Sequence, residues 1–109
     1  MGFYTIHPRE IDSVLMQKNA QIIDVRGREE YRKSHFRNAI NCPYDDMEYW
    51  LRRFPKRRTL LLYCEYGSTS LLAARRLAKE GYQVYTVIGG INAMRKYMSA
   101  GKEGIDIEK

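Results

Sequence analysis

Short apolar runs alternate along this chain with segments in which apolar residues recur at intervals of three or four. The apolar runs have the length of strands, and the periodic segments have the pattern of helices with one buried face. Strands are therefore predicted over residues 3–6, 21–25, 39–42, 60–63 and 82–88. Helices are predicted over residues 7–19, 28–33, 47–54, 68–80 and 91–97. This alternation of strands and helices predicts an α/β sandwich.

The segment 47–54 shows how these boundaries are chosen. It follows Asp45 and Asp46, either of which can cap a helix, and Pro55 ends it. Its apolar residues fall on one face, which indicates packing against a core rather than a cofactor site. They are Met47, Trp50, Leu51 and Phe54.

Cys64 stands where the apolar strand 60–63 ends and a loop begins. The loop contains Gly67, and helical periodicity starts at about Ser68, with a hydroxyl residue expected to cap the helix. In an α/β sheet this edge is where ligands bind, and a helix amino terminus stabilises a thiolate. The alternative is a buried structural cysteine, since free cysteines are often part of a core.

Asp24 and Arg26 end the predicted strand 21–25, at the same edge of the sheet as Cys64. A guanidinium at this edge can take part in ligand binding. We instead favour an ion pair of Arg26 with Glu29 or Glu30 that fixes the following turn.

Length, charge and cysteine content narrow the class of protein. The 109 residues fit one domain over 1–109, with 102–109 as a loose tail. The net charge of +6 suits anionic small substrates, and no nucleic-acid recognition motif accompanies the basic residues. No apolar run is long enough to span a membrane, and no export signal is evident, so we expect a cytoplasmic protein with reduced thiols. Without a CxxC or a Cys/His cluster, no metal site is expected.

The sequence from Cys64 to Ser70, Cys-Glu-Tyr-Gly-Ser-Thr-Ser, resembles the active-site loop of rhodanese-like sulfurtransferases. That pattern is Cys-x-x-Gly-x-(Arg/Thr/Ser)-(Ser/Thr/Ala), followed directly by a helix. Asp-Val-Arg at 24–26 and the stretch from His35 to Asn41 resemble further family signatures, as does the Gly-Gly turn at 89–90. Met94 stands where the family has a tryptophan. The resemblance implies a three-layer sandwich with a mainly parallel five-stranded sheet and helices on both faces.

The resemblance also implies a sulfurtransferase in which Cys64 carries a persulfide. A ring of backbone N–H groups from residues 65 to 69 would hold the sulfur, with no cofactor and no metal. The donor would be thiosulfate or a protein-bound persulfide, the acceptor a thiol or cyanide, and the protein a monomer without nucleic-acid or membrane partners. The expected substrate-binding residues are Glu65, Tyr66, Gly67, Ser68, Thr69, Ser70 and Arg26.

Two departures from the pattern leave other functions open. Glu65 places a negative charge beside the nucleophile, and Thr69 leaves the loop without an arginine, so slow turnover of thiosulfate is expected. A noncatalytic binding module with this fold is therefore an alternative. Phosphatases and arsenate reductases need Cys-x5-Arg, and here Ser70 holds the arginine position, which argues against them.

Two further residues have a structural and a chemical interpretation. His35 is expected to make a structural hydrogen bond rather than act as a base. Cys42 is expected to pack as a small apolar residue, with a resolving thiol for Cys64 as the alternative.

Overall fold

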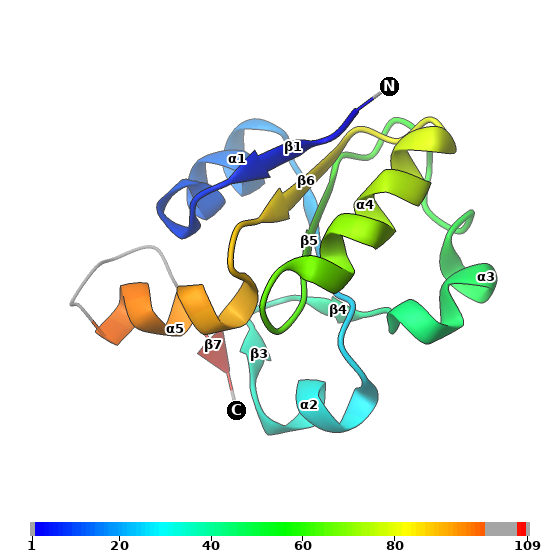
Figure 1. Cartoon of the computed structure of the whole chain (residues 1–109). Coiled ribbons are helices and arrows are strands. Elements are labelled where there is room, and N and C mark those ends of the chain that lie inside the picture. The colour runs from blue at the N-terminus through cyan, green and yellow to red at the C-terminus, as the bar shows by residue number, and fades with distance from the viewer. Residues whose placement is uncertain (1, 100–106, 109) are drawn as a thin grey trace.

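The computed structural model describes residues 2–99 and 107–108. Its centre is a five-stranded sheet in which every neighbouring pair of strands is parallel, in the order β1-β6-β5-β2-β4 (Figure 1). The strands are β1 (Tyr4–Ile6), β2 (Gln21–Asp24), β4 (Ile40–Asn41), β5 (Leu60–Tyr63) and β6 (Val84–Val87). The prediction of a parallel five-stranded α/β sandwich is confirmed. Because β5 lies between β2 and β6, Cys64 follows a central strand.

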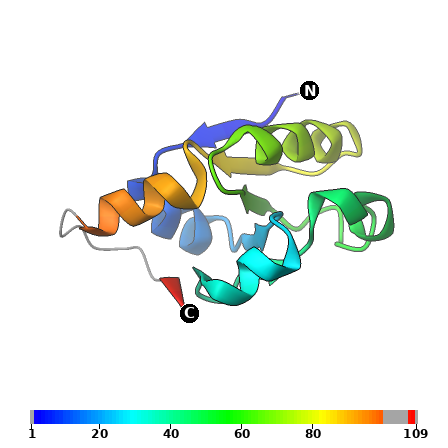
Figure 2. The ribbon, with the colours of Figure 1, turned by 60° about the horizontal axis from the view of Figure 1, so that its bottom comes forward.

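Helices cover both faces of this sheet (Figure 2). The helical segments are η1 (Pro8–Glu10), α1 (Ile11–Gln17), α2 (Arg28–Lys33), η2 (Tyr44–Asp46), α3 (Met47–Trp50), α4 (Ser68–Lys79) and α5 (Gly90–Ser99). Residues of α3 and α4 share one apolar cluster, and residues of α1 and α5 share another. The two clusters are the cores on either side of the sheet.

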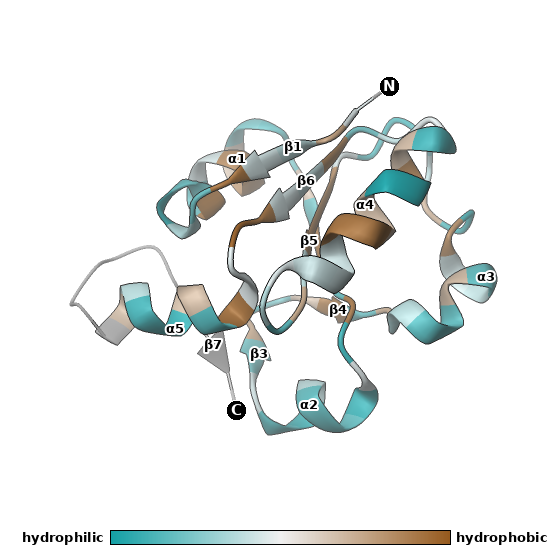
Figure 3. Ribbon diagram, viewed as in Figure 1, coloured by the Kyte–Doolittle hydropathy of each residue, from teal (hydrophilic) through white to brown (hydrophobic). Residues whose placement is uncertain are grey.

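The alternation of side chains along β5 divides its residues between these two cores. Leu60 and Leu62 belong to the cluster that includes Leu77 of α4, whereas Leu61 and Tyr63 belong to the cluster that includes Met94 of α5. All six are fully buried. Strand β5 is therefore apolar on both faces, while α2, without a buried residue, is hydrophilic throughout (Figure 3).

The predicted helix over 47–54 differs from the structure at both ends. The segment 47–54 is helical only to Trp50, after which Arg53 N bonds to Trp50 O in a tighter turn. Helical geometry already begins at Tyr44, so the predicted side-chain caps Asp45 and Asp46 lie inside it and form no cap. The core-facing residues are nevertheless correct, because Met47, Trp50 and Leu51 are buried.

Two asparagines adopt the left-handed backbone conformation in turns between elements. Asn19 follows α1 with φ of +49°, and Asn38 takes φ of +66° before β4. Asparagine tolerates this conformation better than most residues other than glycine. The predicted end of the first helix at Asn19 is confirmed, and Asn38 preserves a turn where the family pattern has glycine.

A short antiparallel pair lies outside the main sheet. Strand β3 (His35–Phe36) pairs with β7 (Ile107–Glu108), so these last two residues are strand and not part of a loose tail. The rest of the predicted tail, 102–106 and 109, lies outside the described residues. Within the described ranges, every helix is too short or too polar to cross a bilayer.

Candidate active site

Two backbone amides point at the sulfur of Cys64. Gly67 N lies 3.1 Å and Ser70 N 3.2 Å from Sγ, and both donate hydrogen bonds to it. Gly67 reaches this position with φ of +110°, and a Cβ on it would lie 3.1 Å from Gly89 N. Amides aimed from a loop and a helix amino terminus favour negative charge on the sulfur.

The helix that follows begins at Ser68 without a side-chain cap, because its cap residue is Gly67. The predicted hydroxyl cap is therefore wrong. Ser70 is fully buried instead, where its Oγ donates to Gly67 O at 3.2 Å and accepts from Thr86 Oγ1 at 2.8 Å. The same oxygen lies 3.5 Å from Cys64 Sγ. The Ser70 hydroxyl thus stabilises the shape of the loop around the sulfur.

The first turn of α5 holds the other side of the loop. Ile91 N donates to Cys64 O at 2.8 Å and Asn92 N donates to Glu65 O at 3.0 Å. The first amides of a helix have no partner within the helix, so these carbonyls satisfy them. Gly89 and Gly90, both at positive φ, bring α5 close enough for these bonds. The Gly-Gly turn noted in the sequence is therefore a support of the Cys64 loop.

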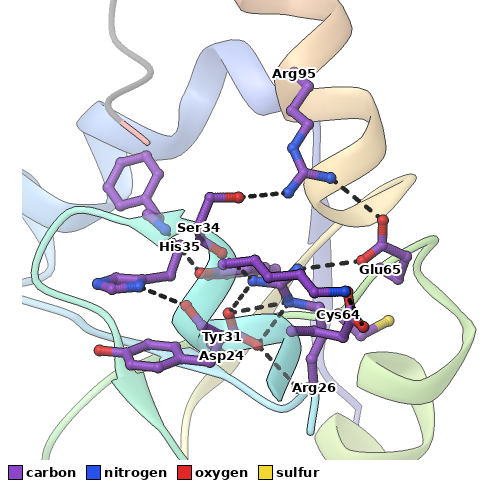
Figure 4. A network of polar contacts seen from close by, with 12 residues as sticks. Asp24, Arg26, Tyr31, Ser34, His35, Cys64, Glu65 and Arg95 are labelled. Atoms are coloured by element: carbon purple, nitrogen blue, oxygen red, sulfur yellow. Dashed lines mark hydrogen bonds and ion pairs between the residues drawn. The ribbon is translucent and has the colours of Figure 1, made fainter. Parts of the chain in front are cut away.

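Arg26 joins the end of β2 to the Cys64 loop (Figure 4). Its guanidinium bonds to both carboxylate oxygens of Asp24 at 2.8–3.1 Å, to Glu65 Oε1 at 3.2 Å and to Ser34 O. The predicted pairing with Glu29 or Glu30 is wrong. Asp24 and Arg26 are both buried, so this is an internal ion pair that fixes the loop rather than a turn on the surface.

Glu65 is held from two sides. Besides Arg26, Arg95 of α5 lies 3.3 Å from Glu65 Oε2 and donates to Ser34 Oγ at 2.7 Å (Figure 4). Burial by itself would lower the pKa of Arg26, but the hydrogen bonds with Asp24 outweigh burial. The pKa is raised overall, so the guanidinium remains charged. The charge of Glu65 is thus compensated within the chain, and the repulsion of the thiolate expected from the sequence is weakened accordingly.

A pocket of about 570 Å³ opens beside Cys64. Of the residues that the sequence singled out, Arg26, Glu65, Tyr66 and Thr69 line this pocket together with Cys64. Gly67 and Ser70 contact the sulfur through their amides. Ser68 is exposed at the start of α4 and does neither. The remaining lining residues are Val25, Gly27, Glu30, Pro43, Tyr44 and Asp45.

Cys42 lies across β2 from Cys64. The parallel registers pair Asp24 with Asn41 on one side and with Tyr63 on the other, so both cysteines flank Val25. Two strand spacings separate their Cα atoms by about 9–10 Å, which is too far for a disulfide without backbone movement. Burial, and secondarily Asp24, raises the pKa of Cys42 to about 11. This geometry favours a packed thiol over a resolving thiol.

The shifted pKa of Cys42 predicts a pH dependence of stability. The unfolded chain loses this proton near pH 9.0 and the folded chain near 11, so the free energy of unfolding falls as the pH rises through this window. Cys42→Ala is expected to make that fall shallower by up to about 1.4 kcal/mol per pH unit. Urea unfolding at several pH values from about 9 to 11 measures it. Equal slopes for both proteins would contradict the assignment.

His35 makes a structural contact away from Cys64. Its Nδ1 lies 2.8 Å from Tyr31 O, and its ring stacks on the Tyr31 ring with centroids 3.8 Å apart. His35 is not among the residues that line the pocket. The expectation of a structural hydrogen bond is confirmed.

Three residues of the site were not expected from the sequence. Thr86 was hidden within an apolar strand, where a lone polar residue indicates a buried hydrogen bond. Arg95 pairs with Glu65, and Ser34 bonds to Arg26 and Arg95; only the fold brings these residues together. In the described part of the chain, no group of histidine, cysteine and carboxylate side chains is arranged to hold a metal ion.

Comparison with known proteins shows the family of this chain. The family model of the rhodanese-like domain matches residues 7–97, and the chain belongs to this family. A rhodanese-like domain protein from Staphylococcus aureus is 29% identical, with a TM-score of 0.78 over 98% of this chain and all of that one. The fold is that of a rhodanese-like domain.

Similar curated proteins fall into two groups by length. A thiosulfate sulfurtransferase, GlpE, from Coxiella burnetii is 26% identical over 89% of this chain and 92% of its own length. A tRNA sulfurtransferase from Desulfurococcus amylolyticus is 35% identical, and the adenylyltransferase and sulfurtransferase UBA4 from Candida albicans is 33% identical. Each of these two matches 82% of this chain, which spans 17% and 23% of their respective lengths.

Proposed function

We propose that this protein is a sulfurtransferase that carries sulfur as a persulfide on Cys64. The observation that supports this most directly is the pair of amide hydrogen bonds from Gly67 and Ser70 to Sγ. Such donors stabilise the thiolate before reaction and the charged persulfide after it, without reorganising. The names of the sulfurtransferase relatives point to the same chemistry.

In the first half-reaction, the Cys64 thiolate attacks the outer sulfur of a sulfane donor from the pocket. A bond forms between Sγ and that sulfur, the sulfur–sulfur bond of the donor breaks, and the leaving group keeps the electron pair. Thiosulfate would leave as sulfite, and a donor persulfide would leave as a thiolate. The amides of Ser68 and Thr69, in the first turn of α4, lie at the same helix end and are suited to the added sulfur.

In the second half-reaction, an acceptor takes the outer sulfur. A thiolate or cyanide attacks it, the Sγ–sulfur bond breaks, and Cys64 returns to the thiolate with the electron pair. The two displacements share one covalent intermediate, so ping-pong kinetics are expected. The protein needs only to keep its loop in one shape through both steps, which the bonds from Thr86 and α5 achieve.

Intact-mass measurement tests this proposal. The reduced protein is treated briefly with thiosulfate or with inorganic polysulfide, desalted and weighed beside Cys64→Ser and Cys42→Ser. A gain of one sulfur atom is expected in the wild type and Cys42→Ser, and none in Cys64→Ser. If no donor modifies an alkylatable Cys64, the noncatalytic binding module becomes the better interpretation.

The phosphatase and arsenate reductase alternative has little support at this site. Ser70, at the position of the required arginine, is fully buried and holds the loop. Arg26, the arginine that lines the pocket, is bonded to Asp24 and Glu65. No guanidinium is therefore placed to fork onto an oxyanion over Cys64 within the described residues.

A further inference from the structure

The pocket beside Cys64 has an acidic lining. Three carboxylates, Glu30, Asp45 and Glu65, face one cation, Arg26. That cation is already engaged within the protein, because its guanidinium bonds to Asp24 behind the pocket and to Glu65 at its side. The net positive charge of the chain therefore does not describe the surroundings of the nucleophile.

The ion pairs around the pocket leave this negative charge in place. Arg26 and Arg95 balance Asp24 and Glu65, whereas the partner of the Glu30 carboxylate among residues 2–99 is Lys33, at 3.5 Å in an exposed pair. Asp45 is exposed, and no hydrogen bond or ion pair of its side chain is found among residues 2–99. Exposed pairs contribute little, so a charged ligand in the pocket would sense Glu30 and Asp45.

Two tyrosines point to the same kind of ligand. Tyr44 and Tyr66 line the pocket, and Tyr66 is 69% exposed at the start of the Cys64 loop. The face of an aromatic ring attracts cations, which adds to the effect of the carboxylates. Aromatic rings and carboxylates around one pocket favour an ammonium group, and they disfavour a dianion such as thiosulfate.

We infer that the preferred sulfur substrate of this pocket is a small thiol or persulfide that carries an ammonium group close to its sulfur. The inference rests on the proposed sulfurtransferase function and names its substrate class. The ammonium lies between the carboxylates and the tyrosines while the sulfur reaches Cys64. In the acceptor step, the aminothiolate bonds to the outer sulfur, the Sγ–sulfur bond breaks, and the Cys64 thiolate leaves with the electron pair.

Three thiols of similar size test the inference. They are cysteamine with an ammonium, 2-mercaptoethanol with a hydroxyl, and thioglycolate with a carboxylate. The protein is loaded with inorganic polysulfide and desalted, and loss of the added sulfur is followed by mass in a single turnover. Rates are expressed per thiolate concentration, and the quantity compared is the ratio of the cysteamine rate to the thioglycolate rate.

Comparing this ratio between protein variants cancels the difference in intrinsic reactivity among the thiols. Glu30→Gln with Asp45→Asn neutralises two lining carboxylates, and we expect the ratio to fall by about tenfold. The matched control is Glu29→Gln with Asp46→Asn. It removes the same amount of charge from the neighbouring residues in the chain, which do not line the pocket. The control is expected to keep the wild-type ratio. Added salt is expected to lower the wild-type ratio.

The outcomes separate this inference from the function on which it rests. A persulfide that forms and discharges with the same ratio in the wild type, the lining variant and the control would overturn the charge selection and leave the sulfurtransferase intact. A chain that takes up no sulfur from polysulfide would overturn both. A ratio that falls equally in the lining variant and the control would assign the effect to net charge and overturn the role of the pocket.

Discussion

Arg26→Met is expected to lower the free energy of unfolding by about 3–5 kcal/mol. Asp24 is fully buried, and its carboxylate accepts from the Nε and Nη2 of Arg26 and from the amide of the same residue. Methionine keeps much of the apolar stem but leaves that carboxylate without a cation. A charge left unpaired in the interior costs far more than the intact pair contributes. Urea unfolding of both proteins measures the loss.

Two companion variants make this result specific. Arg32→Met removes an exposed arginine whose partner, Glu29, is 3.9 Å away, and a change below about 0.5 kcal/mol is expected. Asp24→Leu with Arg26→Met removes both buried charges and is expected to be less destabilised than Arg26→Met alone. A double variant at least as unstable as the single one would show that apolar packing of Arg26, and not its charge, stabilises the fold.

The features that could be predicted from the sequence are those that depend on residues adjacent in the chain. The strand before Cys64 is an unbroken apolar run, so its burial on both faces and its end at the loop follow from the pattern. The positive φ of Gly67 follows from a glycine between a strand and a helix. The family motif adds the expectation that amides surround the sulfur, although Ser70 N, outside the expected stretch 65–69, is one of them.

The charge network could not be read in the same way, because its members are brought together by sheet order. Arg26 and Glu65 are far apart in the chain and meet since β2 and β5 are neighbours. Local spacing favours Glu29 and Glu30 as partners for Arg26, but they lie on the hydrophilic helix α2. The interior pairs Arg26 with Asp24 instead, because a buried charge needs a buried partner. Because Glu65 pairs with Arg26, it repels the thiolate less than the sequence alone suggests.

The Gly-Gly turn shows how a sequence motif acquires a physical reason from the structure. From sequence, two glycines after a strand indicate only a break. In the fold, Gly90 lies against the backbone of the loop that carries Cys64, and α5 bonds to that backbone. The glycines therefore set the distance between two helix amino termini, those of α4 and α5, on either side of the loop. That distance determines whether the amides of Gly67 and Ser70 reach the sulfur.

Gly90→Ala is therefore expected to reduce persulfide formation by a hundredfold or more, a loss of about 3 kcal/mol in transition-state stabilisation. A Cβ on Gly90 would lie 2.6 Å from Glu65 O and 2.7 Å from Glu65 C, and closer still to Cys64 O. These are backbone atoms, so no side chain can move aside. Either the loop shifts away from the sulfur or α5 separates from it, and both break the bonds of Ile91 and Asn92.

Gly81→Ala is the matched control for this variant. Gly81 also has positive φ, +101°, but a Cβ there meets no atom within 4 Å. It therefore carries the backbone strain alone, about 1 kcal/mol of stability, and persulfide formation should stay at the wild-type rate. Initial rates of sulfur uptake by mass, with melting temperatures for all three proteins, separate the two effects. Equal losses of uptake in both variants would assign the defect to strain and remove the proposed support of the loop by α5.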